Sequence, residues 1–116
     1  MSKKSIHEIK STPLGAGNGA SMQMLISPEV APNFAMRKFV IKSGGYMPLH
    51  TNAVEHEQYV LSGSAKVKIG NEELIAQKDD ILYIPANTPH SYVVEGDESY
   101  EFLCLVPNKE DKIEMV

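Results

Sequence analysis

The sequence predicts a single all-β domain, and three observations support this prediction. Six short segments rich in Val, Ile, Tyr and Phe have the length of β-strands: residues 34–41, 57–61, 65–69, 81–84, 91–94 and 100–106. Turn-forming residues separate them, at positions 43–45, 62–63, 70–71, 79–80, 85–87 and 95–97. No segment shows the long apolar stripe of an amphipathic helix. Short strands at this regular spacing are typical of a β-sandwich or β-barrel.

The length and composition limit the classes of protein. A chain of 116 residues with 42% hydrophobic and 22% charged residues is expected to form one ordinary globular domain. A net charge of −4 gives no reason to expect nucleic acid or an anionic membrane as a partner. No apolar run approaches the roughly 20 residues of a membrane span, so we expect a cytoplasmic protein. The single cysteine excludes an intramolecular disulfide.

The chain is expected to have three parts. Residues 1–30 form an N-terminal arm with one or more strands, residues 31–107 form the barrel, and residues 108–116 form a charged, flexible tail. The glycine-rich segment 15–19 resembles a phosphate-binding loop but follows no clear strand and lacks the Lys-Ser/Thr ending. We therefore predict a flexible connection there.

Two histidines, His50 and His56, and an asparagine, Asn52, fall close together in the segment HTNAVEH. His50 and Asn52 are two residues apart, so on an extended strand their side chains point to the same face. His56 begins the next predicted strand, and an antiparallel neighbour about 5 Å away would place it beside them. His90 follows the turn PANTP. Three neutral imidazoles that converge inside a barrel are common ligands of a divalent transition metal.

A lone histidine on a strand is more often a hydrogen-bonded residue than a metal ligand. Here, however, three of the four histidines of the chain lie beside turns at the starts of predicted strands. This combination favours the metal site. His7 lies outside the pattern and is assigned no role.

The segment from residue 44 to residue 63 resembles the first cupin motif, G-x5-H-x-H-x3,4-E-x6-G. Gly44 and Gly63 match its two ends, and His50 matches the first histidine. Asn52 stands where the second histidine is expected, and His56 stands where the glutamate is expected.

The segment from residue 79 to residue 94 resembles the second cupin motif, G-x5-P-x-G-x2-H-x3-N. Pro85 and His90 match, Asp79 and Asn87 replace the two glycines, and Val94 replaces the final asparagine. Asn87 is a credible substitute, because asparagine tolerates a positive φ better than most residues.

The resemblance implies a double-stranded β-helix, the jelly-roll barrel of the cupin superfamily. The chain looks most like the small single-domain manganese cupins of thermophilic bacteria, in which four histidines bind the metal. This resemblance implies one divalent transition metal per chain, held by His50, His56 and His90 with Asn52 nearby. The metal can be Mn, Fe, Ni, Cu or Zn. Small cupins usually dimerise, so a homodimer is expected, with the N-terminal arm as a candidate for exchange between the two chains.

Two interpretations of Asn52 remain open. Its amide oxygen can bind the metal or a metal-bound water, which leaves open coordination positions as in catalytic sites. Alternatively, the loss of an imidazole weakens the site until it is empty.

Four further residues are expected to line the ligand pocket. Gln58 shares the face of His56, and Tyr92 shares the face of His90. The resemblance places Phe102 and Cys104 on the cavity side, although plain core packing for Phe102 and an inert buried thiol for Cys104 are equally good or better interpretations.

No general base is visible, because the glutamates Glu55, Glu57 and Glu101 are expected in a turn or on outward faces. The leading hypothesis is a metal-dependent, dioxygenase-like enzyme acting on a small organic molecule. The alternative is a cupin that binds a small molecule or metal without catalysis. A metal-free sugar epimerase of similar fold fits poorly, because its chemistry requires a base.

Overall fold

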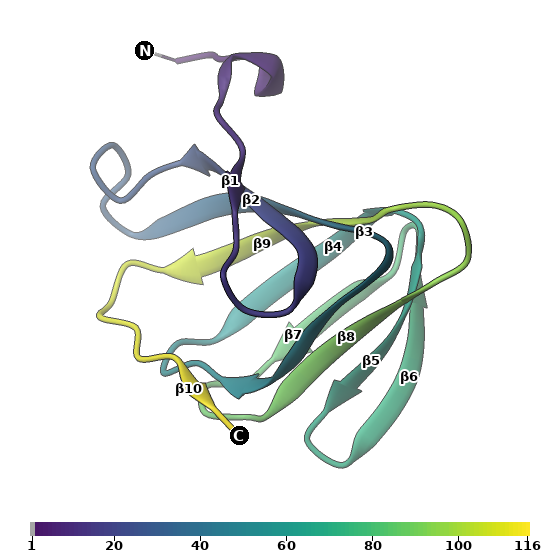
Figure 1. The fold of residues 1–116 in the computed structure, drawn as a ribbon. Helices are drawn as coiled ribbons and strands as arrows, with labels where there is room; N and C mark the ends of the chain where they lie inside the picture. The colour runs from purple at the N-terminus through teal and green to yellow at the C-terminus, as the bar shows by residue number, and fades with distance from the viewer. Residues whose placement is uncertain (1) are drawn as a thin grey trace.

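The computed structural model describes residues 2–116, which form two facing β-sheets with one strand, β3, in common (Figure 1). The elements are η1 (Ile6–Glu8, a 3-10 turn), β1 (Thr12–Pro13), β2 (Asn18–Ile26), β3 (Phe34–Thr51), β4 (His56–Ser62), β5 (Ser64–Ile69), β6 (Glu72–Gln77), β7 (Ile81–Ile84), β8 (His90–Glu95), β9 (Tyr100–Pro107) and β10 (Glu114–Met115). The described residues contain no α-helix, and none of their helices is long and apolar enough to cross a membrane.

Strand β3 belongs to both sheets because it bends in its middle. Its first half pairs with β2 and β9, in a sheet of order β2-β3-β9-β4-β7. Its second half pairs with β8, in a sheet of order β3-β8-β5-β6. The bend lies at Gly44 and Gly45, where Gly44 has a φ of 81°. A Cβ atom on Gly45 would lie 2.5 Å from the carbonyl oxygen of Asn18, so the close approach of β2 to this bend requires glycine.

Alternation of side chains fills the space between the sheets. On β4, His56, Gln58 and Val60 are buried, while Glu57 and Tyr59 point outward, as predicted. Val60 packs into an apolar core formed by buried residues of both sheets. The core occupies one end of the barrel, and the histidines occupy the other.

The predicted pairing of the two strands that flank residues 52–55 is wrong. Strand β9 lies between β3 and β4, and His56 is instead in register with Ile84 of β7. The physical reason is that the second half of β3 belongs to one sheet and β4 to the other, so the chain crosses the barrel mouth between them. His50 and His56 therefore approach each other across the interior rather than side by side.

The N-terminal segment forms a hairpin against the bend of β3. Strand β1 pairs with β2, and Leu14 N donates a hydrogen bond to Ala20 O at 2.9 Å. The segment 15–19, expected to be a flexible connection, forms the turn of this hairpin at residues 15–17 and the start of β2, and Gly17 and Gly19 have φ values of 78° and 73°. Strand β2 pairs with β3 of the same chain, and arm exchange in a dimer stays a prediction.

The C-terminal residues 108–116 run from the start of β3, where Asn108 N donates a hydrogen bond to Asn33 O, to the end of β3 that carries His50 (Figure 1). In β10, Glu114 pairs with Thr51 and Met115 pairs with His50. Ala53 N also donates a hydrogen bond to Lys112 O at 3.1 Å. The segment for which the sequence predicts a flexible tail is therefore placed across the mouth of the barrel.

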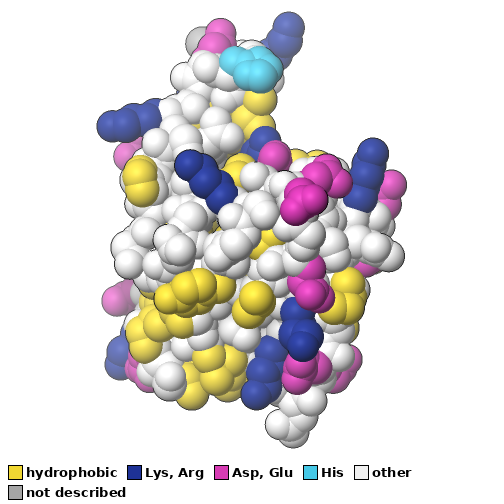
Figure 2. All heavy atoms as spheres, turned by 45° about the vertical axis from the view of Figure 1, so that its right-hand side comes forward, with side chains coloured by type: hydrophobic (Ala, Val, Ile, Leu, Met, Phe, Trp, Pro, Cys, Tyr) yellow, Lys and Arg dark blue, Asp and Glu magenta, His cyan; other side chains and the backbone are white. Residues whose placement is uncertain are grey.

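The surface carries charges of both signs. Figure 2 shows acidic and basic side chains interspersed on one face, with hydrophobic side chains gathered in its lower part. No extended patch of a single sign is visible on this face.

The two glycines at the ends of the first motif allow a matched test of the fold. Gly44 and Gly63 have φ values of 81° and 78°, but a Cβ meets nothing within 4 Å at Gly44, whereas at Gly63 it would lie 2.2 Å from Ser99 O. Gly44→Ala is expected to lower the free energy of unfolding by about 1–2 kcal/mol, the cost of a left-handed conformation. Gly63→Ala is expected to lower the free energy of unfolding by ~1–3 kcal/mol more than Gly44→Ala does, because its Cβ would be overpacked against the start of β9. Urea unfolding measures both values, and equal losses would contradict the steric argument.

Candidate metal and ligand site

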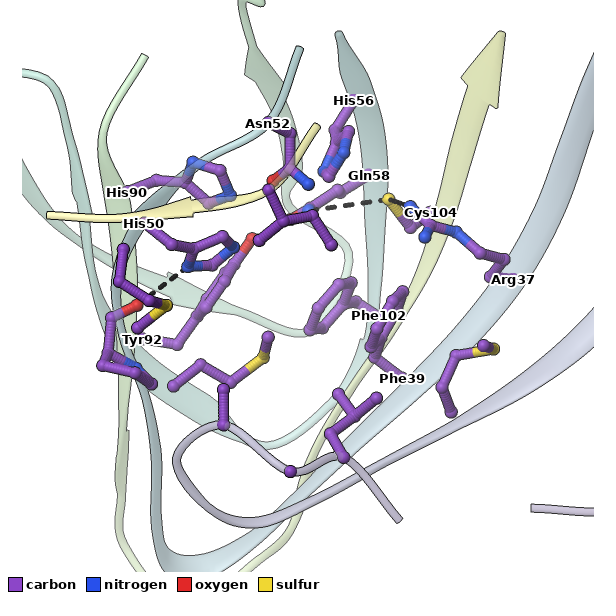
Figure 3. A pocket seen from close by; sticks show the side chains of 18 residues that line it. Arg37, Phe39, His50, Asn52, His56, Gln58, His90, Tyr92, Phe102 and Cys104 are labelled. Atoms are coloured by element: carbon purple, nitrogen blue, oxygen red, sulfur yellow. Dashed lines mark hydrogen bonds between the residues drawn. The ribbon is translucent and has the colours of Figure 1, made fainter. Parts of the chain in front are cut away.

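A cavity of about 350 Å³ lies between the two sheets, below the barrel mouth (Figure 3). The structure brings all the residues predicted for the site to this cavity: His50, Asn52, Gln58, His56, His90, Tyr92, Phe102 and Cys104. In Figure 3 the three histidines and Asn52 gather at one end, and Phe39 and Phe102 form the apolar wall below them.

His50 and His90 face each other on neighbouring strands. They are paired in the register of β3 and β8, and their ring centroids are 4.2 Å apart. A register shift between Met47 and His50 includes Pro48, which has no N–H to donate to the ladder. This bulge brings His50 into line with His90.

Backbone carbonyls fix the tautomer of both rings. His50 Nδ1 lies 2.8 Å from Pro48 O, and His90 Nδ1 lies 2.9 Å from Thr88 O. A carbonyl oxygen only accepts hydrogen bonds, so each Nδ1 carries the proton and donates. In the neutral ring, Nε2 is then the nitrogen with the free lone pair. Histidines that bind metals usually have their other nitrogen held in this way.

Both positions of the second motif segment at which glycine is replaced have a left-handed backbone. Asp79, before β7, has a φ of 72°, and Asn87, in the turn before His90, has a φ of 63°. Asn87 N also donates a hydrogen bond to Asn52 O at 2.7 Å, which ties the second motif to the first. The prediction that Asn87 substitutes for a glycine in a left-handed conformation is confirmed.

His56 reaches the same end of the cavity from the opposite sheet. Its ring centroid lies 5.7 Å from that of His90, and its Nε2 atom is buried without a hydrogen-bond partner. Burial, and next the Arg37 cation, lower the pKa of His56 to about 3. Burial also lowers the pKa of His90 to about 4, against a smaller opposing effect of its hydrogen bond to Thr88. Both rings are neutral at pH 7, as metal binding requires.

Asp111, in the C-terminal segment, orients Asn52. Asn52 Nδ2 donates a hydrogen bond to Asp111 Oδ2 at 3.0 Å, and Ala53 N donates to Asp111 Oδ1 at 2.8 Å. Because a carboxylate only accepts, the NH2 group of Asn52 must point to Asp111. Asn52 Oδ1 is left buried without a hydrogen-bond partner. Nothing in the sequence indicates this contact, because residues 108–116 look like a charged tail.

The donor chemistry of this cluster fits a divalent metal. It offers the imidazoles of His50 and His90 with anchored Nδ1 atoms, and both His56 Nε2 and Asn52 Oδ1 lack the partner that buried polar atoms normally have. The placement is not that of a closed metal centre, however. Across residues 2–116, no three His, Cys, Asp or Glu side chains come together as a group that could hold a metal ion. A metal at this end of the cavity therefore requires side-chain rotation.

A hydrogen-bond network covers the middle of the cavity. Gln58 Nε2 donates to Tyr92 Oη at 2.8 Å and to Cys104 Sγ at 3.8 Å, and Gln58 Oε1 has no partner. Burial raises the pKa of the Tyr92 hydroxyl well above its ordinary value and also raises the pKa of the Cys104 thiol. Both groups are therefore neutral at pH 7. Phe102 stacks between Tyr92 and Phe39, at centroid distances of 5.3 and 5.2 Å, so it belongs to the core and to the cavity wall.

Arg37 of β3 also lines the cavity, and the sequence analysis missed it. Arg37 Nη2 donates a hydrogen bond to Cys104 Sγ at 3.4 Å, and its Cζ lies 5.0 Å from the centroid of the Phe39 ring. Strand alternation would have found it, because Ala35, Phe39 and Ile41 on the same face are buried.

No carboxylate lines the cavity among the described residues. Glu57 points outward, and its pKa is raised to about 7 by partial desolvation and by the neighbouring side chain of Glu55. The prediction that Glu57 faces away from the site is confirmed.

The chain belongs to the cupin family, since the family model described as a cupin domain matches residues 37–106. Cupins often bind a metal ion. The two motif segments and the site described above all lie within the matched residues, except for Asp111.

Two proteins resemble this chain in sequence, and they differ in how much of their length the match covers. An uncharacterized protein of Methanocaldococcus jannaschii is 26% identical over 98 residues, which cover 82% of this chain and 78% of that protein. The 1-methylthio-D-xylulose 5-phosphate methylsulfurylase of Rhodospirillum rubrum is 27% identical over 77 residues, which cover 66% of this chain and 49% of the enzyme. The match therefore spans about half the length of the methylsulfurylase.

Solved structures confirm the jelly-roll prediction. The polyketide cyclase RemF of Streptomyces resistomycificus superposes with a TM-score of 0.90 at 23% identity, over 100% of this chain and 85% of that one. A cupin-2 domain protein of Rhodospirillum rubrum gives 0.87 at 21% identity, over 99% and 80% of the two chains. The oxalate decarboxylase of Lactobacillus farciminis gives 0.78 at 24% identity, over 96% and 34%. At these identities the likeness establishes the fold.

The lowered pKa values predict acid sensitivity of the metal-free protein. In the unfolded chain His56 and His90 bind protons near pH 6.5, whereas in the folded chain they do so near pH 3 and 4. The free energy of unfolding is therefore unaffected by them above pH 6.5 and falls as the pH drops from 6.5 toward 4. Each histidine contributes a slope of at most about 1.4 kcal/mol per pH unit.

Urea unfolding of chelator-treated protein between pH 7.5 and pH 4.5 measures this slope. His56→Gln is expected to remove one histidine's share of it, and His7→Gln, at an exposed position, is the matched control. An identical slope in wild type and His56→Gln would contradict the burial argument.

Proposed function

We propose that this cupin is a metal-dependent enzyme of dioxygenase-like type, which acts on a small organic molecule held in the cavity between its sheets. One observation carries the proposal: three imidazoles and the unpartnered Asn52 oxygen line the polar end of an otherwise largely apolar cavity.

His50, His56 and His90 would hold one divalent transition metal, and Asn52 Oδ1 would be its fourth donor or would accept a hydrogen bond from a metal-bound water. Imidazole ligands suit Mn, Fe, Ni, Cu and Zn in different degrees and do not select one of them. Such an ion would supply Lewis acidity and, if redox-active, reactivity toward oxygen. Asp111 would keep the amide oxygen of Asn52, rather than its NH2 group, turned toward the ion.

The other residues of the cavity would bind and orient the substrate. A volume of about 350 Å³ suits a small molecule. The stacked rings of Phe39 and Phe102 offer an apolar contact, and Gln58, held by Tyr92, offers an amide oxygen that has no other partner. Because no carboxylate lines the cavity, proton abstraction by a side-chain base is disfavoured, and the metal would be the main reactive group.

Relatives support an enzyme without identifying its reaction. A methylsulfurylase, a polyketide cyclase and oxalate decarboxylases are among the proteins that share this domain or fold. Since one fold hosts many unrelated activities, the choice of a dioxygenase-like reaction rests on the cavity itself.

A second candidate is a module that binds a small molecule or metal without catalysis. It is favoured by the lack of a ready-made group of three ligands among residues 2–116, and by Asn52 in place of the second motif histidine. Both features weaken a metal site relative to four histidines.

Metal analysis of protein purified without added metal or chelator distinguishes the two candidates. We expect about one transition metal ion per chain in the wild type, the stoichiometry of a single three-histidine site. His50→Ala and His56→Ala are expected to lose it, and His7→Ala is expected to keep it. If the wild type contains no metal and only Asn52→His binds one, the metal site has lost its function. The non-catalytic binding module is then the better-supported candidate.

Oxygen consumption tests the reaction. Protein loaded separately with Mn, Fe, Ni or Cu is expected to consume oxygen with at least one member of a panel of phenols and dicarbonyl compounds, and His56→Ala is expected to abolish this rate. The absence of turnover with every metal and substrate would contradict the dioxygenase-like reaction.

A further inference from the structure

We propose that Arg37 makes the cavity a binding site for a small carboxylate with an apolar or aromatic body. This inference rests on the proposed function in one respect, that the cavity between the sheets is the ligand site. It adds the chemical class of the ligand and a residue that recognises it.

Arg37 is a cation without an anion. Its Nε atom is buried and has no hydrogen-bond partner, and its one side-chain hydrogen bond goes to a thiol, which is a weak acceptor. The ion pairs of the described residues join Lys38 to Glu101, Lys66 to Glu73 and Lys112 to Glu114, and none includes Arg37. A guanidinium offers five N–H donors, so most of its hydrogen-bonding capacity is free. A partly buried charge left unpaired lowers stability and is relieved when an anion binds.

Asp111 does not neutralise Arg37. The two residues both line a second hollow of about 350 Å³ but form no ion pair. Both carboxylate oxygens of Asp111 already accept hydrogen bonds, one from Asn52 and one from Ala53. Asp111 therefore has its own partners, and the charge of Arg37 remains available to a ligand.

The charged and titratable groups that line the cavity favour an anion. They are Arg37, the three histidines, Tyr92 and Cys104, and no Asp or Glu is among the lining residues. Arg37 is close enough to His56 to lower the pKa of that ring, and Asp111, which is not among the lining residues, has a smaller opposing effect. In a largely apolar cavity the field of an unpaired guanidinium is only weakly screened.

The surroundings of Arg37 indicate what kind of anion fits. Its guanidinium carbon lies 5.0 Å from the centroid of the Phe39 ring, which stacks on Phe102. The body of an anion bound to the guanidinium would therefore contact these two aromatic rings. Figure 3 shows Arg37 reaching toward Cys104 beside this wall. One permanently charged side chain balances one negative charge, and the planar guanidinium matches a carboxylate through two parallel hydrogen bonds. A phosphate monoester carries about 1.5 to 2 negative charges at pH 7 and needs more donors than Arg37 provides.

Binding of three fluorinated probes, followed by 19F NMR, tests the inference. The probes are 4-fluorophenylacetate, its neutral analogue 4-fluorophenylacetamide, and 4-fluorophenyl phosphate. We expect metal-free wild-type protein to bind the acetate at least about tenfold more tightly than the amide, which corresponds to one charge-assisted contact. Arg37→Gln is expected to lose this preference, and Arg37→Lys is expected to keep part of it.

Lys38→Gln is the matched control, because Lys38 is the next residue of the same strand and pairs with Glu101 away from the cavity. It removes the same charge and is expected to leave the preference unchanged. Circular dichroism melts establish whether each variant is folded. If Arg37→Gln does not fold, Arg37→Lys serves as the test. A preference of Arg37→Lys for the acetate over the amide that is no smaller than that of the wild type would contradict the bidentate contact.

Three results would overturn the inference. The first is an equal preference for the acetate in wild type and Arg37→Gln, the second is a preference seen only after zinc is added, and the third is tighter binding of the phosphate than of the acetate. Zinc content, measured on the same samples, separates this inference from the proposed function. Zinc bound without carboxylate preference contradicts the inference alone, and carboxylate preference without any metal binding contradicts the metal-dependent enzyme alone.

Discussion

The membership of β3 in both sheets is the constraint on which the rest of the structure depends. A single strand that bends at Gly44 and Gly45 delivers Arg37 to one side of the cavity and His50 to the other. The chain must then cross the barrel mouth to begin β4, and this crossing carries Asn52 and His56 to the same point from opposite sheets. The site is therefore a consequence of the topology, since His50 and His56 are close in sequence but belong to different sheets, and the distant His90 pairs with His50.

Local features of the chain were predictable from the sequence, and long-range ones were not. The alternation of residues 56–60 and the left-handed conformation of Asn87 follow from rules that act over a few residues. The position of β9 between β3 and β4 depends on pairing between distant segments, and residues 52–55 look the same whether they form a hairpin or cross between sheets. The contact of Asp111 with Asn52 joins residues far apart in sequence and was equally invisible. Arg37 was predictable, because its strand alternates regularly.

The unpartnered polar atoms at one end of the cavity lower the free energy of unfolding. His56 Nε2, Asn52 Oδ1 and Gln58 Oε1 are buried without partners, and each such atom costs about 1–3 kcal/mol relative to a satisfied one. The apolar core at the other end of the barrel and the ladders of two sheets offset these costs. Any cation or donor that binds at this end, and any anion that binds to Arg37, would stabilise the folded state by mass action.

The C-terminal segment forms a part of the cavity wall that is less stable than the rest. Most of the wall belongs to long, mutually paired strands, but Ile113 and Met115, which also line it, belong to a segment held by the two-residue strand β10 and a few hydrogen bonds. Short, exposed pairings open at a much lower free energy than the core of a sheet. Detachment of residues 108–116 would therefore expose the cavity at a lower free energy than separation of the barrel strands. Because Asp111 of the same segment holds Asn52, detachment would also release the amide that faces the three histidines.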